Sequence, residues 1–184
     1  MMKNLVKTFN HILVFILFSF IGWFWETLLV LFLYNSISNI GFLHLPICPI
    51  YGITILLCYL LLGTPKNYKF PLNLLSNEKL KTILYFLILF IVPTIIEVIV
   101  GNYFYNKYGI ILWSYEGLPL TIGKYINVFV SLFWAICIFL IMRYLIKPIY
   151  NFLDNVNTFN IVGLSLIFFL LTTIDFIISI TNKY

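Results

Sequence analysis

Five apolar stretches, each close to the length needed to cross a lipid bilayer, constrain the fold of this chain more than any other feature. A helix of about 20 mostly apolar residues spans the hydrocarbon core of a membrane. The stretches cover residues 11–34, 47–63, 81–101, 126–146 and 161–181. Of the 184 residues, 62% are hydrophobic and 9% are charged, which is more apolar than a soluble fold of this size can bury. The sequence therefore predicts an all-α integral membrane protein with five transmembrane helices, forming one polytopic membrane domain over residues 1–184.

The distribution of basic residues predicts the orientation of these helices, because Lys and Arg mark cytoplasmic loops. With the N-terminus inside, eight basic residues fall on the cytoplasmic side: Lys3, Lys7, Lys66, Lys69, Lys79, Lys81, Arg143 and Lys147. Three fall outside: Lys107, Lys124 and Lys183. We therefore predict a cytoplasmic N-terminus and an outer C-terminus. The net charge of +5 is a topology signal on this interpretation, and no nucleic-acid partner is expected, because no basic patch contains interleaved aromatic residues.

The stretch "GFLHLPICPIYG", residues 41–52, interrupts the apolar pattern between the first two spans. Pro46 and Pro49 cannot continue a helical ladder and leave backbone groups without partners. At membrane depth such backbone is tolerated only where protein or a water-filled cavity satisfies it. We therefore expect a proline-broken, partly inserted and re-entrant outer segment before the second helix. The alternative is a surface turn that precedes an ordinary helix.

Three carboxylates, Glu26, Glu97 and Asp175, lie inside predicted spans. An ionised acid at mid-membrane costs about 3 kcal/mol, so such residues usually face the interior of a helix bundle. With 1.5 Å of rise per residue, Glu26 lies roughly 12 Å and Asp175 about 10 Å from the outer helix end. All three therefore belong to the outer halves of their helices, and we expect them to converge on one outward-facing polar pocket. The alternative is that these acids only lock helices together.

The candidate binding residues combine the three acids with polar and aromatic residues predicted on the same side of the membrane. They are Glu26, Glu97, Asp175, Trp23, Ser19, His44, Cys48, Tyr51, Trp113, Tyr115, Lys124 and Asn127. Such a set can bind a cation or a polar headgroup, or can take up and release a proton. No cofactor, metal site or catalytic residue is predicted, because the sequence contains no Walker, H-E-x-x-H or G-x-S-x-G motif. A lipid-modifying enzyme is a third alternative, for which no nucleophile or metal set is present in the sequence.

Four strings carry a family resemblance: "FSFIGWFWETLL", "GFLHLPICPIYG", "PTIIEVIVG" and "LWSYEGLPLTIGKYINVFVSLFWA". Over residues 15–148 they resemble the bacterial family of type IV ABC-transporter permeases, whose eukaryotic relatives include the transmembrane protein 229 proteins. The matching positions are Ser19, Gly22, Trp23, Glu26, Gly41, Pro46, Cys48, Pro49, Tyr51, Gly52, Glu97, Trp113, Tyr115, Pro119, Gly123 and Trp134. The chain departs from the family pattern in the outer loop, at Ser114, Glu116, Thr121 and Lys124.

The resemblance implies a multi-pass protein of the bacterial plasma membrane that works in an ABC-type transporter. Combined with the predicted pocket, it gives a permease-like membrane subunit with an unidentified small ligand, a separate ATPase subunit and the lipid bilayer as partners. The alternative is a non-transporting membrane sensor, scaffold or lipid-binding protein. The sequence leaves open whether the chain forms a homo-oligomer.

Overall fold

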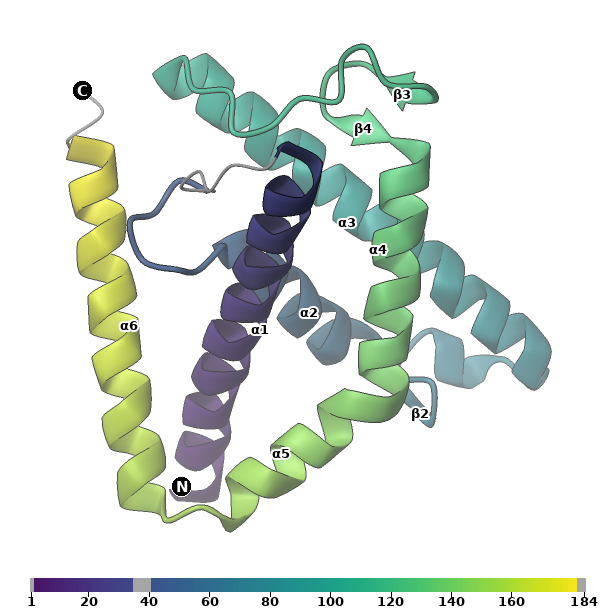
Figure 1. Cartoon of the computed structure of the whole chain (residues 1–184). Helices are drawn as coiled ribbons and strands as arrows, with labels where there is room; N and C mark the ends of the chain where they lie inside the picture. The colour runs from purple at the N-terminus through teal and green to yellow at the C-terminus, as the bar shows by residue number, and fades with distance from the viewer. Residues whose placement is uncertain (1, 35–40, 182–184) are drawn as a thin grey trace. The chain divides into compact units, whose positions relative to one another are not determined.

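The computed structural model describes residues 2–34 and 41–181, and helices make up most of it (Figure 1). The helices are α1 (Met2–Tyr34), α2 (Pro49–Leu62), η1 (Leu72–Leu74), α3 (Glu78–Tyr108), α4 (Val128–Leu140), η2 (Ile141–Leu145), α5 (Ile146–Asn155) and α6 (Thr158–Thr181). Two small antiparallel hairpins join β1 (Gly63–Thr64) to β2 (Asn67–Tyr68) and β3 (Thr121–Ile122) to β4 (Ile126–Asn127). The predicted all-α membrane fold with five apolar helices is confirmed.

Four of the apolar helical stretches are long enough to cross a membrane by themselves. They run over Leu5–Leu28, Glu78–Tyr108, Val128–Asn155 and Thr158–Thr181. The fifth, α2, has 14 residues, which corresponds to about 21 Å against a hydrocarbon core of about 30 Å. Residues 41–48 before it form no helix, and Pro49 is the first helical residue. The second predicted span is therefore a short helix preceded by a proline-broken segment.

The chain divides into two compact units. Unit 1 consists of Met1–Leu56 and Pro148–Tyr184, and unit 2 of Leu57–Lys147. In unit 1, α1 packs along α6, and in unit 2, α3 packs along α4 (Figure 1). That the whole chain forms one membrane domain stays a prediction.

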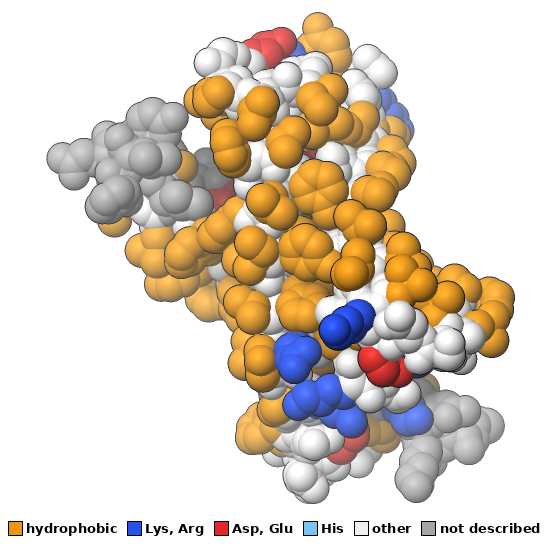
Figure 2. All heavy atoms as spheres, turned by 90° about the vertical axis from the view of Figure 1, so that its right-hand side faces the viewer, with side chains coloured by type: hydrophobic (Ala, Val, Ile, Leu, Met, Phe, Trp, Pro, Cys, Tyr) orange, Lys and Arg blue, Asp and Glu red, His pale blue; other side chains and the backbone are white. Residues whose placement is uncertain are grey.

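Helix α6 has the surface pattern of a helix whose solvent is lipid. Its buried residues are Ile161, Ser165, Asp175 and Ser179. Large apolar side chains occupy its exposed positions, among them Ile167, Phe169, Leu170, Ile174 and Ile177. The face drawn in Figure 2, which is the right-hand side of Figure 1, is likewise covered mostly by hydrophobic side chains. Burying small and polar groups while exposing Leu, Ile and Phe is unfavourable in water, so this pattern supports a membrane environment.

The helix ends are set by local signals, and they extend two of the predicted helices. The Asn77 side chain accepts hydrogen bonds from the backbone N–H groups of Lys79 and Leu80, which caps the start of α3. Gly109, in the left-handed conformation with φ 66°, ends the same helix. The helix predicted over 81–101 therefore runs from 78 to 108. Helix α1 likewise begins at Met2 instead of residue 11.

Helix α5 was not among the predicted helices, because the apolar stretch ends at residue 146. The residues Ile146, Ile149, Tyr150 and Leu153 are spaced i, i+3, i+4 and i+7, which is the pattern of an amphipathic helix. Pro148 lies inside the continuous helical stretch Val128–Asn155, three residues after the π-helical turn η2.

Candidate functional site

Asp175 organises the first polar cluster of unit 1. Its carboxylate is buried in α6 and accepts a hydrogen bond from the backbone N–H of Leu45, with Oδ2 at 2.9 Å. His44 Nδ1 lies 3.0 Å from Asp175 Oδ1 and 3.0 Å from the hydroxyl of Ser179. The structure thus brings together two predicted site residues, His44 and Asp175, that are 131 positions apart.

This cluster can bind a polar group. Both carboxylate oxygens of Asp175 contact protein groups, while the side chain of His44 is 56% exposed. The cluster therefore has a buried carboxyl end and an accessible imidazole end.

Glu26 and Tyr51 form a second polar contact in unit 1. The hydroxyl of Tyr51, in the first turn of α2, donates a hydrogen bond to Glu26 Oε1 in α1. Gly22 lies one turn before Glu26, and a Cβ at Gly22 would overlap the Tyr51 ring. The Gly22 position therefore provides the space in which Tyr51 reaches the acid.

The same face of α1 holds the start of α2. The backbone N–H of Cys48 donates to the carbonyl of Ser19 at 2.9 Å. A Cβ at Gly52 would overlap the carbonyl oxygen of Phe15 and the hydroxyl of Ser19. Ser19 is buried, and its hydroxyl and the indole nitrogen of Trp23 have no hydrogen-bond partner among the described residues.

In unit 2, Asn127 has a structural role at the start of α4. Its Oδ1 accepts from the backbone N–H groups of Phe129 and Val130, at 3.1 and 3.2 Å, and so caps the helix. Its Nδ2 donates to the carbonyl of Pro119 at 2.8 Å and to the Thr121 hydroxyl at 3.1 Å. These contacts give both polar atoms of the Asn127 amide a protein partner, so its burial needs no ligand to explain it.

The remaining predicted residues of unit 2 lie around an aromatic cluster. The ring centroids of Trp113 and Tyr125 are 6.0 Å apart, and the Lys124 ammonium lies 4.7 Å from the centroid of Tyr105. The backbone N–H of Tyr115 donates to the carbonyl of Lys124 at 2.9 Å. Glu97 is half-buried in α3, one turn before Gly101.

Two further buried polar residues of unit 2 are not among the candidate binding residues. Tyr125 and Ser131 are each 5% exposed, and their hydroxyls have no hydrogen-bond partner among the described residues. A Cβ at Gly101 would lie 2.8 Å from the Tyr125 ring, so this ring packs closely on α3. The spacing of Ser131 one turn after Asn127 is the only sequence signal for its burial.

The single outward-facing pocket stays a prediction, because Glu26 and Asp175 belong to unit 1 and Glu97 belongs to unit 2. A pocket of about 450 Å³ lies elsewhere, within unit 1, and its lining is apolar. In the part of the chain that the structure describes, no group of three His, Cys, Asp or Glu residues could hold a metal ion.

Long apolar helices with buried acids and a broken segment before a short helix define a multi-pass membrane protein. A family model described as "Putative ABC-transporter type IV" matches residues 13–180, and the chain belongs to this family. The match confirms the resemblance, which was clearest over residues 15–148 and weaker around Asp175. No curated protein and no solved structure matches the chain.

Proposed function

We propose that this chain is the permease-like membrane subunit of an ABC-type transporter whose ATPase is a separate chain in the plasma membrane complex. The observation that carries the proposal is the family match over residues 13–180, which includes parts of both units. The sequence has no Walker motif, so ATP hydrolysis requires a partner.

Within this function, the two acid clusters of unit 1 are proposed to bind a polar or cationic small ligand from the outer side. An ionised acid in a spanning helix costs about 3 kcal/mol. Helices α1 and α6 of the same unit nevertheless contain Glu26 and Asp175. Both acids contact the proline-broken entry to α2. Glu26 accepts a hydrogen bond from the Tyr51 hydroxyl, and Asp175 contacts the His44 ring and the Leu45 N–H. A segment held by hydrogen bonds of this kind can rearrange when a ligand competes for the carboxylates.

A pull-down of the tagged full chain from its own host in mild detergent, with partners identified by mass spectrometry, tests the proposal. We expect a stoichiometric ATPase, and ATP hydrolysis by the reconstituted complex that Glu26→Gln alters. The exposed residue Glu116 is outside both clusters, so Glu116→Gln is the matched control. A pure chain without ATPase, in the same preparation that keeps other complexes intact, would contradict the transporter function.

A non-transporting scaffold or sensor is the second candidate, and one observation favours it. Both oxygens of Asp175 are already in contact with His44 and with the N–H of Leu45, as in an interaction that only joins helices. This candidate predicts no ATPase in the complex and unchanged behaviour of the Glu26→Gln protein. Light scattering of the purified protein, unmodified and with Glu26→Gln, would show whether each of the two is a homo-oligomer.

A further inference from the structure

Residues 63–77 of unit 2, between α2 and α3, form an ordered segment that packs on the first turns of α3. The hairpin of β1 and β2 is followed by η1, whose Leu72 is 3% exposed. The Tyr85 hydroxyl of α3 donates to the Gly63 carbonyl at 3.0 Å, and the rings of Tyr68 and Tyr85 have centroids 5.5 Å apart. The segment therefore has a buried inner side, which fixes the positions of the side chains that it exposes.

Two large apolar side chains of this segment are exposed. Phe70 and Leu74 are each 71% exposed, whereas Leu72 between them is buried. Both would be removed from water if the segment lay against the headgroup region of a bilayer. The exposed pair therefore favours a partner surface with an apolar component.

Basic residues flank this pair in the sequence. Lys66, Lys69 and Lys79 are exposed and have no acidic partner in the described part of the chain. The acid of this region, Glu78, is paired with Lys81 at 2.5 Å. The segment therefore exposes positive charge beside apolar side chains. We call these residues the loop surface: Lys66, Lys69, Phe70, Leu74 and Lys79.

Contacts between α3 and α4 place basic residues at one end of this helix pair. The two helices pack along each other in opposite directions, and the ring centroids of Tyr85 and Phe139 are 6.2 Å apart. Lys81 lies four residues before Tyr85 and Arg143 four residues after Phe139, so both are at the same end. Helix α3 has 31 residues, which is about 46 Å against a hydrocarbon core of about 30 Å. Its charged first turn therefore has room to lie at the headgroup level, where basic residues are usual.

Two lysines of the loop surface contact this end of the helices. The Lys69 ammonium donates to the Leu60 carbonyl in the last turn of α2 at 2.8 Å and lies 5.6 Å from the ring centroid of Tyr59. The Lys66 ammonium lies 6.0 Å from the ring centroid of Tyr144. Tyrosine and lysine side chains are both typical of the boundary between hydrocarbon and headgroups. These contacts support a position of the loop surface at the membrane boundary.

We propose that the loop surface binds the headgroups of anionic phospholipids and inserts Phe70 and Leu74 among them. The lysines supply the charge that complements phosphate, and each Lys near a membrane surface strengthens binding of anionic lipid about fivefold. The two apolar side chains favour a lipid surface over a purely polar acidic one. With the predicted orientation, these lipids belong to the cytoplasmic leaflet. The loop surface lies within unit 2, and its lipid binding does not depend on the transport function.

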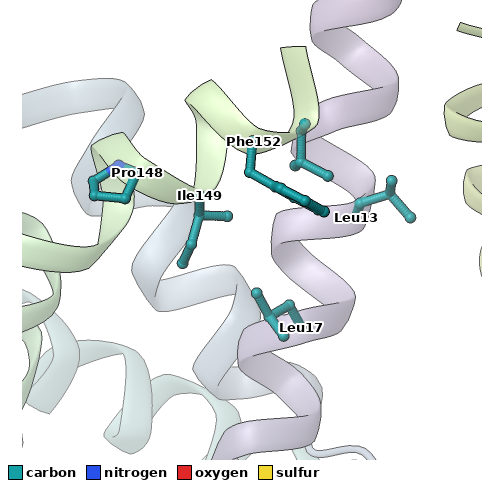
Figure 3. A pocket seen from close by; sticks show the side chains of 6 residues that line it. Leu13, Leu17, Pro148, Ile149 and Phe152 are labelled. Atoms are coloured by element: carbon teal, nitrogen blue, oxygen red, sulfur yellow. The ribbon is translucent and has the colours of Figure 1, made fainter. Parts of the chain in front are cut away.

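The apolar pocket of unit 1 lacks such charges and provides a control position. It lies between α1 and α5 and is lined by Leu13, Leu17, Pro148, Ile149, Phe152 and Leu153. Figure 3 shows the Phe152 ring extending from α5 toward α1. Phe152 is 68% exposed, close to the exposure of Phe70, and Asp154 follows it by two residues. A lipid beside Phe152 is therefore not expected to be selected for a negative headgroup.

The first experiment places the photo-reactive residue p-benzoylphenylalanine at position 70 of the full chain, or at position 152 as the control. The protein is irradiated in nanodiscs of equal amounts of phosphatidylglycerol and phosphatidylcholine with identical acyl chains, and mass spectrometry identifies the lipid adducts. We expect mainly phosphatidylglycerol adducts at position 70 and both lipids in the proportion of the mixture at position 152. Adducts in the proportion of the mixture at position 70 would overturn the proposal.

The second experiment removes charge while the photo-reactive residue stays at position 70. Lys66→Gln and Lys79→Gln should each lower the ratio of phosphatidylglycerol to phosphatidylcholine adducts about fivefold. Lys107→Gln removes the same charge from the last turn of α3, at the other end of the helix, and should leave the ratio unchanged. An unchanged ratio in both loop variants would overturn the proposal.

The third experiment tests the apolar contribution and the competing occupant. With the photo-reactive residue at position 74, Phe70→Ser should lower the yield of lipid adducts severalfold. Phe129→Ser, at a 60% exposed position in the first turn of α4, should leave the yield unchanged. In membranes of the host, irradiation at position 70 should again give lipid adducts. One protein joined in place of lipid would overturn the proposal, because the loop surface would then be a protein interface.

Discussion

The two units of this chain treat buried polar groups differently. In unit 1, several of them pair with groups far away in the sequence, as in Asp175 with His44 and Leu45, or Asn10 with Asp154, although the buried Ser19 hydroxyl has no hydrogen-bond partner among the described residues. In unit 2, Asn127 bonds to groups within eight residues, while the buried hydroxyls of Tyr125 and Ser131 have no hydrogen-bond partner among the described residues.

The difference teaches which contacts hold each unit together in lipid. Apolar burial gives little drive for helices to associate in a bilayer, so close packing and interhelical hydrogen bonds carry more of the stability. Unit 1 uses both, with hydrogen bonds joining α6 to residues 44 and 45 and α5 to α1. Unit 2 combines a buried hydrogen bond, which the Tyr85 hydroxyl donates to the Gly63 carbonyl at 3.0 Å, with ring packing, such as that of Tyr125 on Gly101 and on Trp113. Removal of polar groups should therefore damage unit 1 more than unit 2.

The largest effect is expected for Asp175→Leu, which removes the acceptor for the Leu45 N–H and the partner of His44. Leaving these groups unsatisfied should lower the free energy of unfolding by about 3 kcal/mol. Asp175→Asn keeps an acceptor for Leu45 and offers a donor to His44, so it should cost about 1 kcal/mol or less. Equilibrium unfolding in mixed micelles, followed by circular dichroism, measures both. Equal losses for the two variants would mean that hydrogen bonding at this position is unimportant.

Glycine substitutions should separate packing against backbone from packing against a movable ring. At Gly52 a Cβ meets the Phe15 carbonyl, which cannot turn away, so Gly52→Ala should cost about 1–3 kcal/mol. At Gly101 it meets only the Tyr125 ring, and Gly101→Ala should cost less. Gly163 has nothing within 4 Å, so Gly163→Ala should stabilise α6 by up to about 1 kcal/mol. The same unfolding measurement ranks the stabilities of the three variants. A larger loss for Gly101→Ala than for Gly52→Ala would contradict the expected order.

Removing a single hydroxyl from each unit sharpens the comparison further. Tyr51→Phe removes the donor to Glu26 in unit 1 and should cost about 1–2 kcal/mol. Tyr125→Phe removes a buried hydroxyl without a described partner in unit 2, and should change stability by less than about 0.5 kcal/mol. Melting curves of both variants, recorded in one detergent, measure the two losses of stability. A larger loss for Tyr125→Phe than for Tyr51→Phe would contradict the difference between the units.

The smallest effect concerns the rate at which Cys48 is labelled. The Cys48 thiol is half-buried, so an impermeant thiosulfonate should label it more slowly than an exposed thiol. The matched control is Leu118→Cys, at a 53% exposed position of the predicted outer side, which should react faster at the same pH.

Labelling also tests the orientation. Both thiols should react on intact cells if the N-terminus is cytoplasmic. Reaction of both only after the membrane is opened would show the opposite orientation.

Some features of this protein follow from its sequence because they depend on short-range properties. The length of an apolar stretch decides whether a helix can span lipid, so the all-α membrane fold with five apolar helices was predictable. Pro49 is tolerated at the first position of a helix but cannot continue a helix from the residues before it, and Pro46 adds a second interruption, so the broken entry to α2 was predictable too. The family also follows from the sequence, since its motifs are contiguous strings such as "GFLHLPICPIYG".

Only the tertiary structure decided which groups the candidate residues contact. Asp175 meets His44 across 131 positions, and Asn127 turns out to cap α4, a role that its place among candidate ligands did not suggest. Helix α5 and its pocket were missed, because an amphipathic helix of ten residues is too short and too polar to register as a span. The physical reason is common to these cases. Hydrogen bonds and pockets form between segments that chain folding brings together, and neither spacing nor hydropathy encodes which segments meet.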